Sequence, residues 1–436
     1  MTEIILAIFF ITVLLLFLSS GVWVALSMIG VSAIAMELFT SRPVGDAMAT
    51  TIWGMSSSWT LTALPLFVWM GEILFRTKLS ENLFEGLSPW MQKLPGGLIH
   101  VNVVGCAIFA AISGSSAATV ATVGKMSIPE LRKRKYPEKI LLGSLAGSGT
   151  LGLLIPPSII LIIYGVTVQE SIAKLFVAGI VPGIMIALFF MGYVILWSLL
   201  NKKEMPNIFT KYSFMEKIRR SSKLIPVILL IFSVIGSIYT GIATATEAAS
   251  LGVVGSLVLS FFQNSLNWNN FKNSLLGATI TSCMISFILA GSAFLSLAMG
   301  FTGLPRNLAL WINSLELSPY ILIFVLMIFY IILGMFLDGI SAVVLTMAII
   351  EPMIRQAGFD MIWFGIFLVV VVEMAQITPP VGFNLFVLQG MAKKDMGFIA
   401  KSAFPLFVLM ILATFVLIIF PEIVMWLPDQ MIKNIS

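Results

Sequence analysis

The sequence predicts an all-α, polytopic membrane protein, built as an inverted repeat with two re-entrant hairpins and two Pro-Pro-broken helices. Of its 436 residues, 59% are hydrophobic and only 10% are charged, whereas a soluble domain carries roughly 25% charged residues. Several apolar runs are too short to cross a hydrocarbon core of about 30 Å, which takes about 20 helical residues. They end in small-residue turns or in proline pairs, and each kind of interruption occurs twice: Gly114–Ala117, Ile155–Ser158, Gly339–Ala342 and Thr378–Pro380.

The two halves of the chain carry these interruptions in the same register. Pro156 and Pro379 lie 223 positions apart, and so do Pro129 and Pro352. Non-helical backbone is tolerated at membrane depth only where it is buried in protein or lines a cavity. Interrupted segments at corresponding positions of two halves are the best sequence indication of a transporter's binding site. We therefore expect both turns and both broken helices to meet around one site.

The first half begins with long apolar segments and continues into the first interrupted pair. We expect a transmembrane span at about 4–36, then an amphipathic stretch followed by a span at 59–75, and an interfacial helix at 76–93. A hairpin at 97–128 follows, and the chain then crosses the membrane from Lys139 through Pro156 and Pro157. An interfacial segment at 168–176 and a span at 179–200 complete this half.

The second half repeats the pattern after a polar linker at 201–223. We expect spans at 224–239, 243–262 and 275–299, an interfacial helix at 304–314, a hairpin at 319–354, a crossing from Met361 through Pro379 and Pro380 to Leu388, and a final span at 404–420. By role, residues 1–93 and 179–318 form scaffold helices, 94–178 and 319–391 form the two halves of a transport domain, and 392–436 form a C-terminal interfacial segment and final helix.

Clusters of basic residues predict the orientation. Lysine and arginine gather at 125–139, 201–223 and 393–401, and basic loops stay on the cytoplasmic side of a membrane. Spans counted from these loops make the first hairpin enter from the cytoplasm and the second from outside, as in an inverted repeat. The same count predicts a cytoplasmic N-terminus, on a retained helix, and an external C-terminus.

Few acidic residues lie within the apolar segments. Asp338 directly precedes the second small-residue turn, and an intramembrane carboxylate is a functional candidate by default. Its alternative role is to cap the helix that follows. For Glu373 and Glu247, a structural ion pair or a helix-end position explains the residue at least as well as ligand binding. Serines precede the predicted helix starts at both turns, where a helix N-terminus offers N–H groups to an anion.

The two breaks provide oxygen ligands. Proline removes the N–H donor that would satisfy a carbonyl one turn earlier, and serine and threonine hydroxyls surround both proline pairs. Such an all-oxygen cage suits a hard cation such as Na⁺. Two cages beside an anion site built from helix ends would form a cation-coupled carboxylate carrier. The chain has a single histidine, His100, and no nucleophile–base constellation, so we do not expect an enzyme.

At these motifs the chain resembles the large membrane subunit of a tripartite ATP-independent periplasmic (TRAP) transporter over essentially its whole length. The resemblance is carried by SGSSAATVATVGKMSIPEL (113–131), GSLAGSGTLGLLIPPS (143–158), GMFLDGISAVV (334–344) and EMAQITPPVGFN (373–384). It implies elevator-type, Na⁺-driven uptake of an organic acid across the bacterial inner membrane, which makes the external side the periplasm. It also implies a periplasmic substrate-binding protein and a small four-helix membrane subunit, here a separate chain.

The resemblance also assigns residues to sites. One Na⁺ site would use Ser115, Ser116, Gly147 and Pro156, and a second would use Gly339, Thr378 and Pro379. The substrate would lie between the two turns, near Ser113, Asp338, Ser341 and Asn384.

Overall similarity favours the sialic-acid branch, and a carboxylate in the site suits a polyhydroxylated acid better than a dianion. A stand-alone dicarboxylate or citrate-type carrier, or a cation antiporter, shares the inverted-repeat logic but would work without a binding protein. A channel fits less well, because hairpins at a broken-helix interface suit alternating access better than a continuous pore.

Overall fold

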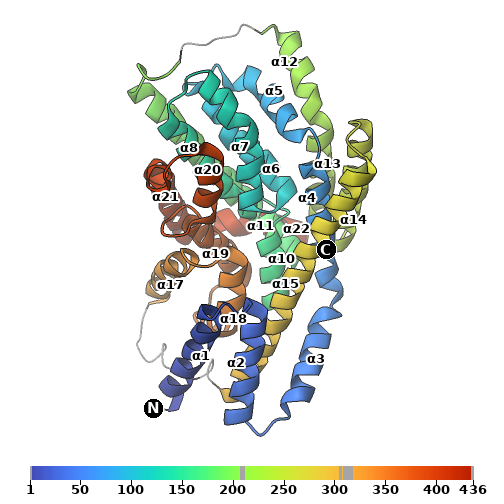
Figure 1. Cartoon of the computed structure of the whole chain (residues 1–436), viewed down its shortest axis with the longest axis vertical. Coiled ribbons are helices and arrows are strands. Elements are labelled where there is room, and N and C mark those ends of the chain that lie inside the picture. Colours follow the sequence, from blue (N-terminus) through green and yellow to red (C-terminus); the bar gives the residue numbers. More distant parts are fainter. Residues whose placement is uncertain (1, 207–211, 304–306, 308–317, 434–436) are drawn as a thin grey trace.

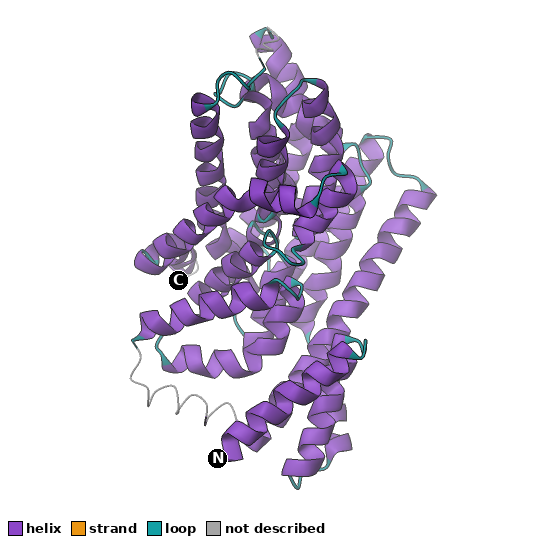
Figure 2. Ribbon diagram, turned by 60° about the vertical axis from the view of Figure 1, so that its left-hand side comes forward, coloured by secondary structure: helices purple, strands orange, loops and turns teal. Residues whose placement is uncertain are grey.

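The computed structural model describes residues 2–206, 212–303, 307 and 318–433. In these residues every regular element is a helix (Figure 2), which confirms the predicted all-α class. Seven of the described helices are long and apolar enough to cross a membrane, or eight if one bent pair counts as a single span.

The N-terminal apolar run forms two helices and not the single span predicted at 4–36. Helix α1 covers Thr2–Ser19 and helix α2 covers Val24–Phe39. Gly21 between them has a φ of +81°, a left-handed conformation that favours glycine. The hydroxyls of Ser19 and Ser20 donate to carbonyls in the last turn of α1. These local hydrogen bonds compete with helix continuation, and the chain reverses there.

The next crossing is bent. Helix α3 (Val44–Ser56) is followed by a short 3-10 turn and helix α4 (Ala63–Phe75), and the two parts meet at 52°. The stretch predicted as amphipathic is therefore helical, and with the span predicted at 59–75 it forms either one bent span or a re-entrant segment. Helix α5 (Leu79–Met91) lies where the interfacial helix at 76–93 was predicted.

Both predicted hairpins and both broken helices are present. Figure 1 shows the first hairpin in the upper half of the molecule and the second hairpin in the lower half. The first pair consists of α6 (His100–Ser113), α7 (Ser116–Lys133), α8 (Glu138–Gly149), α9 (Leu151–Leu154) and α10 (Ile159–Val168). The second consists of α17 (Pro319–Gly334), α18 (Gly339–Gln356), α19 (Met361–Ala375) and α20 (Phe383–Ala392).

Long helices connect and surround these pairs. They are α11 (Ile172–Leu200), α12 (Phe214–Ser221), α13 (Ile225–Tyr239), α14 (Ala245–Phe262), α15 (Trp268–Thr302), α21 (Met396–Ile419) and α22 (Glu422–Lys433). The segment predicted as interfacial at 168–176 contains the end of α10, a turn and the start of α11 at Ile172, which Ser171 caps; its place relative to the membrane stays a prediction. The predicted final span continues into the additional helix α22, which packs on α11 and α19. The predicted helix at 304–314 lies outside the described residues, apart from residue 307.

The two ends of the molecule differ in what they carry. In Figure 1, α5 and α12 lie at the top, whereas the N-terminus and the turn between α2 and α3 lie at the bottom. The start of α1 and helix α12 of the basic linker are therefore at opposite ends of the molecule, although the N-terminus and the linker were both predicted to be cytoplasmic. The side on which each terminus lies stays a prediction.

The two halves interlock through their broken helices. Helix α20 of the second half packs against α7 and α8 of the first, and α10 of the first half packs against α18 and α19 of the second. Each of these short helices ends at a non-glycine residue in the left-handed conformation, Gln169 and Lys393. Such an ending leaves carbonyls of the last turn available to outside donors.

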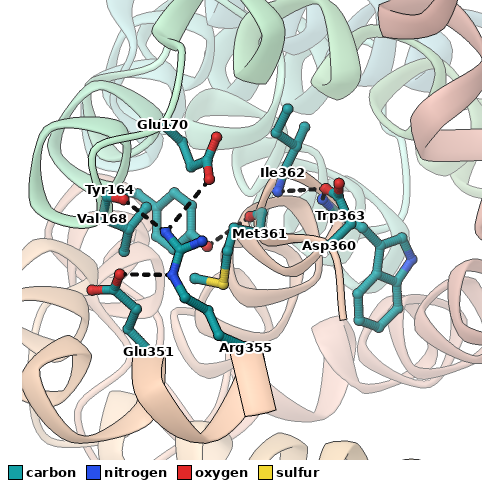
Figure 3. A network of polar contacts seen from close by, with 9 residues as sticks. All are labelled: Tyr164, Val168, Glu170, Glu351, Arg355, Asp360, Met361, Ile362 and Trp363. Atoms are coloured by element: carbon teal, nitrogen blue, oxygen red, sulfur yellow. Dashed lines mark hydrogen bonds and ion pairs between the residues drawn. The ribbon is translucent and has the colours of Figure 1, made fainter. Parts of the chain in front are cut away.

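An arginine from the opposite half bonds to each of these helix ends. Arg132 of α7 donates to the carbonyl of Ala392 (2.8 Å) and pairs with Glu138. Arg355 of α18 donates to the carbonyl of Val168 (3.1 Å) and pairs with Glu351 and Glu170, as Figure 3 shows. A cation is favoured at a helix C-terminus. The two contacts, which we call the arginine clamps, join each hairpin to the broken helix of the other half.

Candidate functional site

A cavity of about 360 Å³ lies where the two hairpin turns meet. Its wall contains residues 113–118 from the first turn and 338–340 from the second. Gln376 and Phe383 from the ends of the second break also line it, as does Leu153 from the first broken helix. The opposite wall belongs to α4 and α15. The two turns and both broken helices thus reach one site.

The first turn is shaped by one glycine and three serines. Gly114 ends α6 with a φ of +58°, and a Cβ there would lie 3.1 Å from the carbonyl oxygen of Pro157. The Ser113 hydroxyl pairs with Thr119 at 2.8 Å, and Ser115 caps α7. A side chain at position 114 would therefore separate the turn from the first proline break.

The second turn places a carboxylate at the start of a helix. Asp338 caps α18, because its Oδ2 accepts hydrogen bonds from the N–H groups of Ile340 (3.1 Å) and Ser341 (3.2 Å). Asp338 also lines the cavity. The capping role and the position in the site, which the sequence offered as alternatives, therefore coexist in one residue.

The wall opposite the turns carries an ion pair. Glu72 of α4 lines the cavity and pairs with Arg76 one turn later. Gly71 beside it lets the first turn come close, since a Cβ there would lie 3.0 Å from the carbonyl oxygen of Ile112. Of the described side chains that line the cavity, Glu72 and Asp338 are charged and none is basic.

The structure gathers only part of the predicted Na⁺ ligands. Ser115, Ser116 and Gly339 line the cavity, but Gly147, Pro156, Thr378 and Pro379 do not. A Cβ on Gly147 would meet Leu406 of α21, and its carbonyl accepts from the Thr150 hydroxyl at 2.6 Å. The Thr378 hydroxyl donates back to the carbonyl of Met374 at 2.9 Å. Pro156 is buried, whereas Pro379 is exposed.

The predicted substrate residues divide in the same way. Ser113 and Asp338 line the cavity, whereas Ser341 and Asn384 do not. Asn384 is fully buried in α20, where its amide lies near Gly149 of α8. Neither its Oδ1 nor its Nδ2 has a hydrogen-bond partner among the residues that the structure describes.

Sequence reasoning gave too little weight to Glu373. This residue of α19 is fully buried, and its carboxylate oxygens Oε1 and Oε2 lie 2.6 and 2.7 Å from the Ser116 hydroxyl of the first turn. The signal was present, because Glu373 is the one charged residue in the apolar run 361–375. Its partner lies 257 positions earlier in the chain, so no local pattern could identify the pair.

Comparison with known proteins gives consistent relatives. Residues 11–423 match the family described as "Tripartite ATP-independent periplasmic transporter, DctM component". The chain is 32% identical over 400 residues to a C4-dicarboxylate TRAP transporter large permease protein of Pseudomonas aeruginosa, covering 91% of this chain and 92% of that one. It is 30% identical over 388 residues to the 2,3-diketo-L-gulonate TRAP transporter large permease protein of Escherichia coli, covering 86% and 88%.

Two further comparisons concern a longer relative and a solved structure. An isethionate TRAP transporter permease protein of Oleidesulfovibrio alaskensis is 31% identical over 416 residues, which cover 94% of this chain and 64% of that protein. The crystal structure of the YdaH transporter of Alcanivorax borkumensis matches 96% of this chain with a TM-score of 0.66 at 11% identity. At that identity the likeness concerns the fold alone.

Proposed function

Because this chain belongs to the DctM component family of the tripartite ATP-independent periplasmic transporters, we propose that it carries a polyhydroxylated organic acid inward by Na⁺-coupled elevator transport. It is a multi-span transporter subunit and not an enzyme. The family implies a small membrane subunit and a periplasmic binding protein. The substrate, the coupling ion and the type of motion are our proposals.

One observation carries this proposal: the cavity has two walls that belong to different parts of the chain. One wall consists of the two hairpin turns and the ends of the breaks, and the other consists of α4 and α15. A carrier must expose its site to each side in turn. We propose that the hairpins and broken helices slide past α4, α15 and the remaining scaffold helices as one body.

The charges at the cavity favour an acid with one carboxylate and several hydroxyl groups. Asp338 lines the cavity without an ion-pair partner among the described residues. A second carboxylate on the substrate would face this negative charge, whereas a substrate hydroxyl can donate a hydrogen bond to it. The cavity volume of about 360 Å³ falls in the usual range of small-molecule sites. Sialic acid fits this description, and we propose it as the substrate.

The hydroxyl and carboxylate groups around the first turn suit Na⁺. Ser115 and Ser116 line the cavity, and the Glu373 carboxylate lies 2.6 Å from the Ser116 hydroxyl. Oxygen ligands of this kind select hard cations. When bound, the ion would supply the positive charge that the site lacks. The second predicted set fits less well, because only Gly339 of its three residues lines the cavity.

Reconstituted transport tests the proposal. Uptake of radiolabelled sialic acid would be measured in proteoliposomes that contain this chain alone, the chain with its small subunit, or both with the binding protein. Each sample would be measured with and without an inward Na⁺ gradient, and with an excess of an unlabelled C4-dicarboxylate as competitor. We expect uptake only with all three components and Na⁺, and little competition.

Other outcomes would identify the alternatives. Uptake by this chain alone would favour a stand-alone carrier and contradict the tripartite assembly. Strong competition by the C4-dicarboxylate would replace sialic acid by a dianion as the substrate class. Equal uptake with and without the gradient would reject Na⁺ coupling.

A further inference from the structure

Glu373 is a buried carboxyl group without a basic partner among the described residues. The residue is fully buried in α19, and no basic side chain in the described parts of the chain forms an ion pair with it. Buried charges in proteins are paired or coordinate metals, because an isolated ionised carboxylate in an apolar interior is very unfavourable. An ionised Glu373 would therefore need a bound cation, whereas the alternative is a protonated, neutral carboxyl group.

The Ser116 hydroxyl cannot supply this balance alone. It lies 2.6 and 2.7 Å from the two carboxylate oxygens, yet a hydroxyl has one proton to donate. It contributes a dipole but no charge. The Ser116 oxygen retains lone pairs, so the hydroxyl and the carboxylate together form a compact group of three oxygen donors.

This group lies beside the cavity. Ser116 and Gln376 both line the cavity wall, whereas Glu373 lies one helical turn behind Gln376 on α19. The side-chain nitrogen of Gln376 is buried without a hydrogen-bond partner among the described residues. Ser116 therefore brings this group of oxygens to the cavity wall, whereas Glu373 itself does not line the cavity.

We propose that Glu373 and Ser116 hold a monovalent metal cation, for which Na⁺ is the probe, and that this ion fastens the first hairpin turn to α19. One carboxylate balances one positive charge, and the described residues contain no group of three acidic, histidine or cysteine side chains that would hold a divalent ion. Glu373 belongs to neither of the two predicted sets of Na⁺ ligands, although it begins the motif at 373–384. The inference rests on the proposed Na⁺ coupling.

The consequence for the site is that ion binding organises one wall of the cavity. Ser116 is the first residue of α7, and the neighbouring residues of the same turn line the cavity. An ion held between Ser116 and Glu373 would link hairpin and broken helix across 257 positions of sequence. Without the ion, the two negative oxygens would remain uncompensated, so the turn would separate more readily from α19.

Direct ion binding tests this inference without measuring transport. The full chain would be placed in lipid nanodiscs, and radioactive Na⁺ binding would be measured by scintillation proximity. Thermal unfolding would be followed in NaCl and in N-methyl-D-glucamine chloride at equal ionic strength. For E373Q and S116A we expect the apparent Na⁺ affinity to fall by about tenfold or more, the range seen when a metal ligand loses a partner. E351Q, which alters a half-buried carboxylate of α18 that is paired with Arg355 and lies outside the cavity, is the matched control and should bind Na⁺ like the wild type.

Unfolding gives a second readout that does not depend on affinity. We expect E373Q to be at least as stable as the wild type in Na⁺-free buffer, because replacing an uncompensated buried charge by a neutral side chain removes its desolvation cost. We also expect the stabilisation by Na⁺ to be smaller in E373Q.

The outcomes separate this inference from the proposed function. If the wild type binds Na⁺ and E373Q binds it equally well, Glu373 is not a ligand, although Na⁺ coupling stands. If the wild type shows neither Na⁺ binding nor stabilisation, the coupling proposal and the Glu373 site both fail. If low pH in Na⁺-free buffer stabilises the wild type against thermal unfolding as much as Na⁺ does, Glu373 holds a proton and the metal site is rejected.

Discussion

At the scale of single residues, Asp338 combines a structural and a functional position. Its Oδ2 caps α18, and the residue lines the cavity. Asparagine caps helices about as well as aspartate, so D338N should keep the fold and remove only the charge. We expect the initial uptake rate to fall by about tenfold or more, which corresponds to about 1.4 kcal/mol of lost interaction free energy. Uptake in proteoliposomes and elution in size exclusion measure the two properties.

Asp360 provides the matched control for this substitution. It caps α19 with the same pattern of backbone hydrogen bonds, to Ile362 and Trp363, but it lies outside the cavity. D360N should transport at the wild-type rate. Equal uptake by D338N and D360N would remove Asp338 from the site.

Residue patterns predicted which positions lie at the turns better than which atoms face one another. Small residues at 113–116 and the carboxylate at 338 are visible in the sequence, and the structure places them at the cavity. The surroundings of Asn384 and Gly147 depend on tertiary packing: Asn384 lies against α8, and Gly147 lies against α21. A single sequence does not contain that information.

At the scale of elements, the contact between α4 and the first hairpin depends on Gly71. A Cβ at this position would lie 3.0 Å from the carbonyl oxygen of Ile112 and 3.4 Å from Ser113 Cα. Valine adds further atoms to this contact, and overpacking costs about 1–3 kcal/mol. If α4 is the surface along which the hairpin moves, G71V should reduce uptake more than it reduces stability.

Uptake rate and thermal unfolding, measured on the same samples, test this prediction. G236V on α13 is the control, because a Cβ there meets nothing within 4 Å. A normal uptake rate in G71V would show that the contact between α4 and the turn does not affect transport.

The packing of α8 against α21 leads to a prediction about stability. A Cβ on Gly143 would lie 2.2 Å from the carbonyl oxygen of Ser402, and backbone cannot move aside cheaply. G143A should lower the free energy of unfolding by about 1–3 kcal/mol. Thermal unfolding would measure the effect, with G192A on α11, where the space is open, as the control. Equal thermal unfolding midpoints for G143A and G192A would show that the contact between α8 and α21 does not contribute to stability.

Element boundaries were predictable where composition changes sharply, and less so within uniform apolar runs. Hairpins, breaks and linkers begin or end at proline, glycine or charged residues, and the structure agrees with these assignments. The division between α1 and α2 depends on one left-handed glycine and two serine side chains. Glycine and serine also occur inside transmembrane helices, where they allow close packing. The sequence was therefore interpreted as a single tilted span.

At the scale of the whole molecule, the arginine clamps predict coupling between distant segments. R132A removes the donor to the end of α20, and R355A removes the donor to the end of α10. Hydrogen exchange should therefore increase in peptides from 383–392 for R132A and from 159–168 for R355A, because local opening becomes easier. Each effect should appear in the half that does not carry the substitution.

Arg134 offers a control for these measurements. It pairs with Glu130 one turn away in its own helix, so R134A should leave exchange in α20 unchanged. Exchange that rises only near the substituted arginine would indicate that the clamps are local contacts without a role in joining the halves.

The reciprocal clamps also bear on the ancestry of the chain. Neither half contains both partners of a clamp, and each short helix packs on the hairpin of the other half. If one shorter gene gave rise to both halves, its product could form these contacts only with a second copy inserted in the membrane in the opposite orientation. The ancestor would then have been a dual-topology homodimer, and fusion of two copies turned an intermolecular contact into an intramolecular one.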